Sequence, residues 1–124
     1  MKRIKVFKPQ KGIGGMKFNG KAHIDAMYKD PKWISYSKKY LDINPRCYCC
    51  GNPSQAVDHL KAHKGDKTLF WTDINLLPLC HRCHNTATAL FDRFPVQKYN
   101  EKLAWLARCR SINQLSFKVM VVPV

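Results

Sequence analysis

Two cysteine pairs with the same internal spacing constrain the fold of this chain more than any other feature. The first pair reads Cys47-x-x-Cys50-Gly51, and the second reads Cys80-x-x-Cys83 about thirty residues later. A two-residue gap lets both thiolates of a pair reach one ion, and two such pairs complete a tetrahedral four-sulfur zinc site. The sequence therefore predicts a structural Zn²⁺ bound by Cys47, Cys50, Cys80 and Cys83.

Further residues near the pairs leave other ligand sets open. Cys49 offers a tighter Cys47-x-Cys49 bite, and His81 and His84 could compete as ligands. We favour the four cysteines with the two-residue gap and interpret Cys49 as a packed thiol. Cys109 stands alone, and a lone cysteine is more often a small core residue than a reactive one. A zinc ion with four thiolates has no open position for water, so any reaction needs a second site.

The charge balance favours a polyanionic partner. The 124 residues include 22 Lys and Arg against 8 Asp and Glu, which gives a formal net charge of +14 with His neutral. Such a surplus in a short chain repels itself unless a polyanion is the usual partner, with nucleic acid ahead of an acidic membrane surface. A merely soluble basic surface is the plainer alternative. At this length we expect one domain over residues 1–124, with a small core that benefits from a metal staple.

The start of the chain and its hydropathy favour a cytoplasmic protein. Lys5, Lys8 and Lys11 interrupt the apolar stretch that a secretory signal would need after Met1, Lys2 and Arg3. No run of about eighteen apolar residues is present, so we expect no membrane span. In a reducing compartment, six cysteines favour metal binding over disulfides.

The N-terminal part is expected to form an arm followed by a helix. Residues 1–22 are basic and glycine-rich, which fits either a flexible arm that contacts phosphates or a disordered tail, with one short strand near Ile4–Phe7. Residues 30–43 predict a helix, because Asp30 can cap it and aromatic residues recur every three or four positions. We expect this aromatic stripe to be core rather than a base-stacking platform.

The C-terminal part, residues 96–124, is expected to form a helix and then a strand. The helix over residues 96–110 would point Tyr99, Leu103 and Leu106 inward and its basic residues elsewhere. Those basic residues are Lys98, Lys102, Arg108 and Arg110. Residues 115–122 alternate and then run apolar, which predicts a terminal strand whose expected partner is the strand near Ile4–Phe7.

The interval between the cysteine pairs holds the residues that could carry chemistry. The stretch Ala-Val-Asp58-His59-Leu predicts a short strand from its apolar and β-branched residues. Asn75 opens a second apolar strand, which runs into the second cysteine pair. His84 follows that pair directly, and residues 81–94 predict a helix. The expected local order is therefore strand, loop, strand, helix.

This combined pattern resembles the HNH endonucleases, the zinc-knuckle-bearing branch of the ββα-metal (His-Me finger) nucleases, and small phage-encoded members look especially similar. The resemblance covers about half of the chain. It rests on the strings Asn44-Pro45-x-Cys47-x-x-Cys50-Gly51, Val57-Asp58-His59 and Asp73-x-Asn75-Leu76-x-x-Leu79-Cys80-x-x-Cys83-His84. It implies a small α+β fold with a zinc-stapled ββα-metal core over residues 30–94, flanked by helices and terminal strands.

The resemblance also implies a role for each signature residue. His59 would be the general base, because an imidazole near its ordinary pKa of about 6.5 can take a proton from the water that attacks phosphorus. Asp58 and His84 would ligate a catalytic Mg²⁺ or Mn²⁺, which neutralises charge at the leaving 3′ oxygen. Asn75 would tie the loop between the strands and hold His59 in orientation.

Departures from the family pattern bear on the contacts with DNA. Relatives often carry a proline two residues after the base and a lysine after the last histidine, and this chain has neither. His63 is therefore an alternative base or a DNA contact, and Arg82 or Arg93 is expected to replace the missing phosphate contact. The expected nucleic-acid-binding residues are Lys61, His63, Lys64, Arg82 and Arg93. For Phe70 and Trp71 in the same loop, we expect packing rather than DNA contact.

The resemblance thus implies a metal-dependent HNH endonuclease that hydrolyses phosphodiester bonds of double-stranded DNA, and the net charge of +14 leads us to expect little sequence preference. We expect a monomer or weak dimer without membrane association, located in the host cytoplasm if the chain is phage-encoded. The alternative is a zinc-stabilised module that binds nucleic acid without cutting it.

Overall fold

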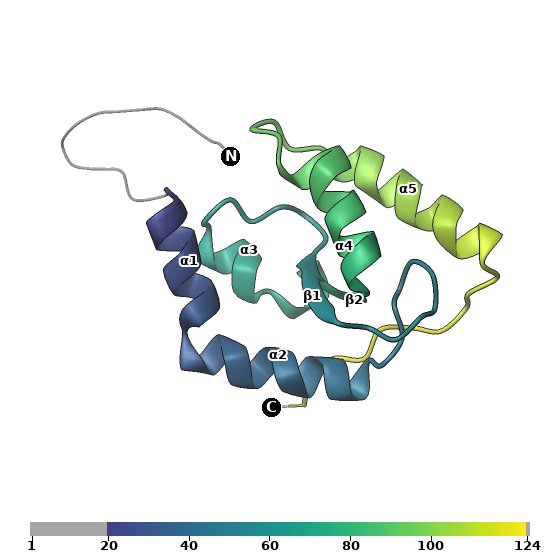
Figure 1. Cartoon of the computed structure of the whole chain (residues 1–124), viewed down its shortest axis with the longest axis horizontal. Coiled ribbons are helices and arrows are strands. Elements are labelled where there is room, and N and C mark those ends of the chain that lie inside the picture. The colour runs from purple at the N-terminus through teal and green to yellow at the C-terminus, as the bar shows by residue number, and fades with distance from the viewer. Residues whose placement is uncertain (1–19, 124) are drawn as a thin grey trace.

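The structure is a computed structural model that describes residues 20–123. In this part of the chain, five α-helices surround one two-stranded antiparallel sheet (Figure 1). The elements in chain order are α1 (Lys21–Lys29), α2 (Pro31–Ile43), β1 (Ala56–His59), α3 (Lys67–Trp71), the 3₁₀ turn η2 (Asp73–Asn75), β2 (Leu76–Leu79), α4 (His81–Ala87), the π-helical turn η3 (Thr88–Asp92) and α5 (Tyr99–Ile112). The expected α+β class is confirmed.

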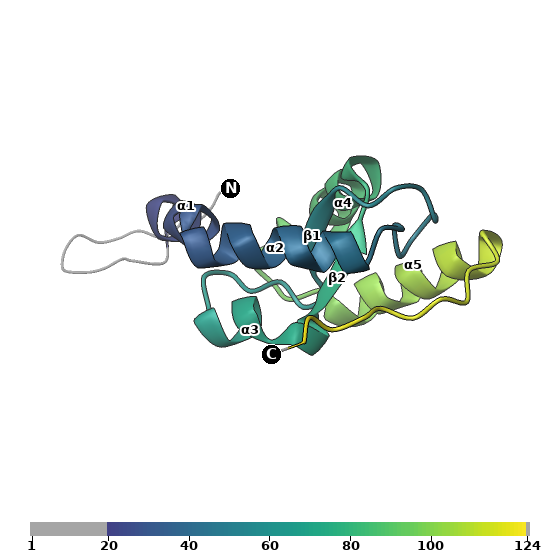
Figure 2. The ribbon, with the colours of Figure 1, turned by 90° about the horizontal axis from the view of Figure 1, so that it is seen from below.

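The sheet places neighbouring residues of β1 on opposite faces. β1 pairs with β2 so that Asp58 lies opposite Leu77 and His59 lies opposite Leu76. Side chains alternate along a strand, so Asp58 and His59 point to different sides of this small sheet. Figures 1 and 2 show α1 and α3 toward one end of the molecule and α5 toward the other, with the sheet between them.

Helix α2 forms where the sequence predicts it. The Asp30 side chain caps it by accepting a hydrogen bond from the Lys32 N–H, and Pro31 occupies the first turn. Trp33 is 5 % exposed and Tyr40 is 1 % exposed. The interpretation of the aromatic stripe as core is therefore confirmed, and these rings share one apolar cluster with Phe70 and Leu76.

Helix α1 corrects the predicted end of the N-terminal arm. We expected an arm over residues 1–22, but α1 already begins at Lys21. No side chain caps this helix, so its N-terminus carries no clear sequence signal. Contacts of its side chains with α2 and α3 explain why it forms. Tyr28 makes edge contacts with the Trp33 and Phe70 rings at centroid distances of 6.2 and 5.1 Å. The predicted strand near Ile4–Phe7 lies outside the described residues.

The terminal strand predicted over residues 115–122 is wrong. The segment runs without a β-ladder among the residues that the structure describes, and side chains hold it instead. The Asn44 amide donates to the Met120 carbonyl and accepts from the Met120 N–H, and Arg110 donates to the Phe117 carbonyl. An asparagine side chain thus takes the place of a neighbouring strand, which an alternating pattern cannot indicate.

The helix predicted over residues 81–94 changes its hydrogen-bonding pattern halfway. The Arg93 N–H bonds the Thr88 carbonyl five residues earlier, so η3 replaces further turns of α4. A π turn shifts the side chains that follow relative to α-helical periodicity. Leu90 lies within this π turn and is 49 % exposed, whereas Ala87, three residues earlier, is fully buried.

Across residues 20–123, none of the helices combines the length and the apolar character needed to cross a membrane.

Helix α5 offers a matched test of the core near the cysteine pairs. Leu106 is 2 % exposed and packs in the apolar cluster around the cysteines, whereas Ile112 on the same helix is 73 % exposed. Leu106→Ala should lower the free energy of unfolding by about 2–5 kcal/mol through lost burial and the cavity left behind. Ile112→Ala should change it by less than about 0.5 kcal/mol. Denaturant unfolding of the zinc-loaded protein measures both, and equal losses would contradict the assignment of Leu106 to the core.

Candidate functional site

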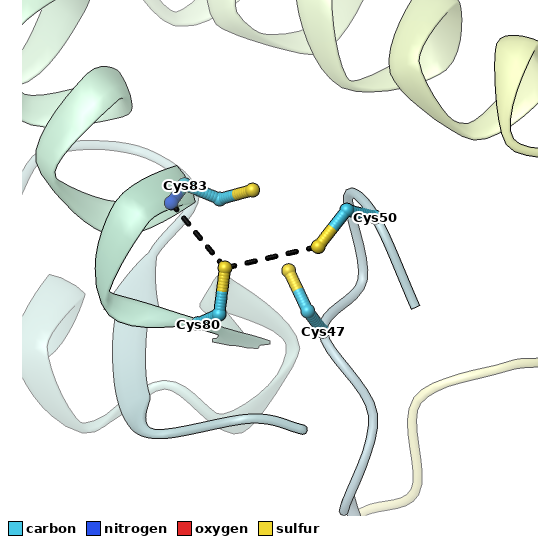
Figure 3. A group of neighbouring side chains, drawn as sticks. All are labelled: Cys47, Cys50, Cys80 and Cys83. Carbon is cyan, nitrogen blue, oxygen red and sulfur yellow. Dashed lines mark hydrogen bonds between the residues drawn. The ribbon is translucent and has the colours of Figure 1, made fainter. Parts of the chain in front are cut away.

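The four cysteines of the two pairs converge on one point (Figure 3). Their sulfur atoms all lie within 4.8 Å of one another, and the Cys50 and Cys80 sulfurs are 3.7 Å apart. A tetrahedron with zinc–sulfur bonds of about 2.3 Å has sulfur–sulfur edges of roughly 3.8 Å. The cluster formed by Cys47, Cys50, Cys80 and Cys83 can therefore hold a structural metal such as zinc, as its sequence spacing predicts.

Two local structures present these sulfurs. The first pair sits on a turn in which the Gly51 N–H bonds the Cys47 carbonyl, and Gly51 adopts a left-handed φ of +82° that favours glycine. The second pair begins α4, where the Cys80 sulfur accepts a hydrogen bond from the Cys83 N–H. The four-cysteine cluster thus ties the turn after α2 to the junction between β2 and α4.

The other candidate ligands are placed elsewhere. Cys49 is 3 % exposed, and burial together with a hydrogen bond to Cys109 raises the pKa of its thiol to about 12. It is a packed thiol, as expected, and Cys109 lies half-buried against the same apolar cluster. His81 is exposed on the surface of α4, and the His84 ring is hydrogen-bonded to Asp58. Neither histidine belongs to the metal-binding group found among residues 20–123.

Asp58 and His84 meet outside the four-cysteine cluster. The Asp58 Oδ1 and His84 Nδ1 atoms are 2.8 Å apart, although the residues are 26 positions apart in the sequence. This hydrogen bond raises the pKa of His84. Burial alone would raise the pKa of Asp58, but the bonds and charges of His84 and Lys102 outweigh burial and lower it. The pair therefore joins one imidazole nitrogen and one ionised carboxylate at a single point.

The Asp58–His84 pair has contact with solvent on one side only. Asp58 is 2 % exposed, whereas the His84 side chain is 35 % exposed. His84 forms part of the wall of an open depression of about 260 Å³, which Trp33, Ser37 and Gln55 also line. An ion or a phosphate group would therefore approach this pair from the His84 side.

His59 lies on the opposite face of β1, beneath the aromatic cluster. It is 4 % exposed, and its ring stacks on Trp33 at a centroid distance of 5.6 Å and an angle of 20°. The His59 Nε2–H donates to the Phe70 carbonyl at 3.0 Å, so the unprotonated ring nitrogen is Nδ1. Burial lowers the pKa of His59 to about 4, which keeps the imidazole neutral at physiological pH.

Asn75 closes the loop between the two strands. Its Oδ1 accepts from the Lys61 N–H at 2.8 Å, and its Nδ2 donates to the carbonyls of Lys61 and Leu69 at 3.0 and 2.9 Å. Its own carbonyl accepts from the Leu60 N–H at 2.7 Å. These bonds pin the chain directly after His59, so the loop-tying contacts expected of Asn75 are present.

The residues expected to bind nucleic acid fall into two groups. Lys61, Arg82 and Arg93 are exposed, and the Arg93 Nε–H donates to the Ala89 carbonyl. The Lys64 ammonium instead donates to the backbone carbonyls of Asp92 and Phe94.

His63 is buried, with 9 % of its surface exposed, and both of its ring nitrogens have partners. Its Nδ1 accepts from the Gly65 N–H, and its Nε2–H donates to the Tyr28 hydroxyl. Its expected role as a DNA contact or an alternative base stays a prediction. In the same loop Phe70 is fully buried, as expected, and Trp71 is 39 % exposed.

Lys102 and Asp92 are the site residues that sequence reasoning missed. Lys102 was expected on the outer face of its helix, but its side chain is 1 % exposed. Its ammonium donates to Asp58 Oδ2 at 2.6 Å, to the His59 carbonyl at 2.7 Å and to Asp92 Oδ2 at 2.9 Å. The available signal was its spacing of four residues from the buried Leu106, which places both on one helix face.

Comparison with protein-family models gives no match for this chain, and comparison with curated proteins gives none either.

The four-cysteine cluster predicts that each chain binds one zinc ion. The purified chain should contain one zinc ion, and Cys47→Ser or Cys80→Ser should lose it together with most of the folded structure, because a structural zinc supplies folding free energy. Cys109→Ser should keep the ion and serves as the matched control. Elemental analysis and circular dichroism measure both properties. Full zinc content in Cys80→Ser would contradict the assignment of the ligands.

Proposed function

We propose that this chain is a metal-dependent nuclease that hydrolyses DNA phosphodiester bonds, as the HNH endonucleases do. The observation that carries the proposal is the meeting of Asp58 and His84 at 2.8 Å outside the four-cysteine cluster, with His59 next along the same strand and on its other face. Three signature residues of the family pattern are thereby gathered on one ββα unit. The cluster itself would keep a structural role, since four thiolates leave no position for water.

The donor atoms of the Asp58–His84 pair suit a catalytic Mg²⁺ or Mn²⁺ ion. Mg²⁺ sites in nucleotide-processing enzymes commonly use one or two protein carboxylates, with water and phosphate oxygens completing the shell. An imidazole nitrogen beside the carboxylate suits Mn²⁺ as well. When bound there, such an ion would neutralise the negative charge that develops on the phosphate and the leaving oxygen.

His59 would act as the general base through Nδ1. Its Nε2–H is fixed on the Phe70 carbonyl, so the tautomer that accepts a proton at Nδ1 is already selected. The imidazole is neutral at physiological pH because burial lowers its pKa to about 4. A bound phosphate would bring a negative charge close to the ring and raise this pKa, which strengthens the base when substrate is present. Asn75 would keep the following loop, and with it the orientation of the ring, in place.

Affinity for DNA would come mainly from the positive charge of the chain. A formal charge of +14 allows many phosphate contacts, and such contacts are largely independent of sequence. Lys61, Arg82 and Arg93 are exposed residues of this kind, and each lies within two positions of His59, His84 or Asp92 in the sequence.

One observation favours the alternative of a zinc-stabilised module that binds nucleic acid without cutting it. His59 is 4 % exposed beneath Trp33, so a phosphate reaches its ring only if the aromatic cover shifts. A chain in which that cover never opens would still present its basic surface to DNA.

Cleavage of supercoiled plasmid separates the two functions. The zinc-loaded protein should nick or cut the plasmid with Mg²⁺ or Mn²⁺, and His59→Ala should slow cleavage by about 10²–10⁴-fold, the usual contribution of a general base. Plasmid binding by zinc-loaded His59→Ala, measured by gel shift without added Mg²⁺ or Mn²⁺ and without chelator, should stay within about twofold of the wild type, because phosphate contacts dominate affinity.

His81→Ala is the matched control, since His81 is an exposed histidine on α4 and should leave cleavage unchanged. If the folded, zinc-loaded wild type binds plasmid but does not cut it in the presence of any divalent metal, the nuclease function is refuted and the binding module is supported.

A further inference from the structure

We propose that Lys102 is a positioning residue for the candidate catalytic site, an inference that rests on the proposed function. Its ammonium fills an oxygen-lined pocket between Asp58, Asp92 and the His59 carbonyl. It thereby leaves only one oxygen of Asp58 to act together with His84.

Lys102 is buried and fully hydrogen-bonded. Lysine is almost never fully buried unless it is paired, and this side chain is 1 % exposed. An ammonium group has three N–H donors. The three acceptors are Asp58 Oδ2 at 2.6 Å, the His59 carbonyl at 2.7 Å and the Asp92 carboxylate at 2.9 and 3.1 Å. Every donor is satisfied, so the ammonium has one well-defined position.

Three separate elements build this pocket. β1 supplies Asp58 and the His59 carbonyl, and α5 supplies Lys102. Asp92 is the last residue of η3, where the hydrogen bond from Arg93 to Thr88 spans five residues. Asp92 thus faces α5 from within this π turn, where its carboxylate accepts from Lys102.

The consequence for Asp58 is that each of its oxygens has a different partner. Oδ2 is held by Lys102, and Oδ1 faces His84 Nδ1 at 2.8 Å. A carboxylate held at one oxygen cannot rotate freely, so the other oxygen stays directed at the imidazole. The bond to the His59 carbonyl also fixes the backbone that carries the proposed base.

The positive charge of Lys102 also affects where a divalent cation can bind. Asp58 and Asp92 are two carboxylates at a single point, and Lys102 supplies the positive charge between them. Without the ammonium, two carboxylates and a backbone carbonyl would surround an empty position, which is a donor set for a hard divalent cation. Lys102 thus takes the place that such a cation would occupy and keeps the incoming ion on the His84 side.

Mn²⁺ binding to the zinc-loaded full chain, measured by electron paramagnetic resonance without DNA, tests this role. In the wild type, His84→Ala should weaken Mn²⁺ binding at least about tenfold, and Asp92→Asn should change it less than about twofold. When the same two substitutions are added to Lys102→Met, their effects on Mn²⁺ binding should be exchanged. Asp92→Asn should then weaken binding at least about tenfold, and His84→Ala should have little effect. Arg108→Met, at an exposed position of the same helix, should retain the wild-type pattern.

Each result bears on the inference. A Lys102→Met protein whose Mn²⁺ affinity still depends on His84 and not on Asp92 overturns it, and so does a wild type with no dependence on His84. If Lys102→Met is unfolded without added metal, millimolar Mn²⁺ should restore its circular dichroism spectrum, and failure to do so overturns the inference. If the effects of His84→Ala and Asp92→Asn on Mn²⁺ binding are exchanged in Lys102→Met but the wild type leaves plasmid intact, only the nuclease function is refuted. If the wild type cuts plasmid but the two effects are not exchanged, only the role of Lys102 is refuted.

Discussion

The convergence of four cysteine sulfurs within 4.8 Å is the constraint on which the rest of the described structure depends. It joins a turn that follows α2 to the point where β2 ends and α4 begins. The sheet has only two strands of four residues each, which is too little to hold its register alone. A metal bound at the cluster would supply the stability that a core of this size lacks, and β1, β2 and α4 would then keep a fixed arrangement.

With that arrangement held, the alternation of side chains along β1 separates two environments. Asp58 faces α4 and α5, where its partners are an imidazole and an ammonium group. His59 faces the aromatic cluster, where burial lowers its pKa and keeps it neutral. One strand therefore carries an ionised acid on one side and a neutral imidazole on the other, and the difference arises from what packs against each face.

Buried polar groups on both faces are held by specific partners. Lys102 satisfies Asp58, Asp92 and the His59 carbonyl, and Asn75 satisfies the backbone of the loop that follows β1. Such networks are costly when incomplete and rigid when complete. The candidate site is thus part of the interior of the molecule, and its contact with solvent is mainly through His84 and the depression beside it.

The sequence by itself determined the features that depend on local spacing. The two-residue gaps indicated the four-cysteine cluster, the capped aromatic stripe indicated α2, and the dipeptide Asp58-His59 between β-branched and apolar residues indicated β1. Only the tertiary structure decided that Lys102 is buried, that Asp92 reaches it through a π turn, and that both ring nitrogens of His63 are engaged. A residue pattern records which face of a helix is apolar, but a lysine is buried only when acceptors from other elements surround its ammonium. Those acceptors come from residues 10, 43 and 44 positions away, a distance that no local periodicity can reach.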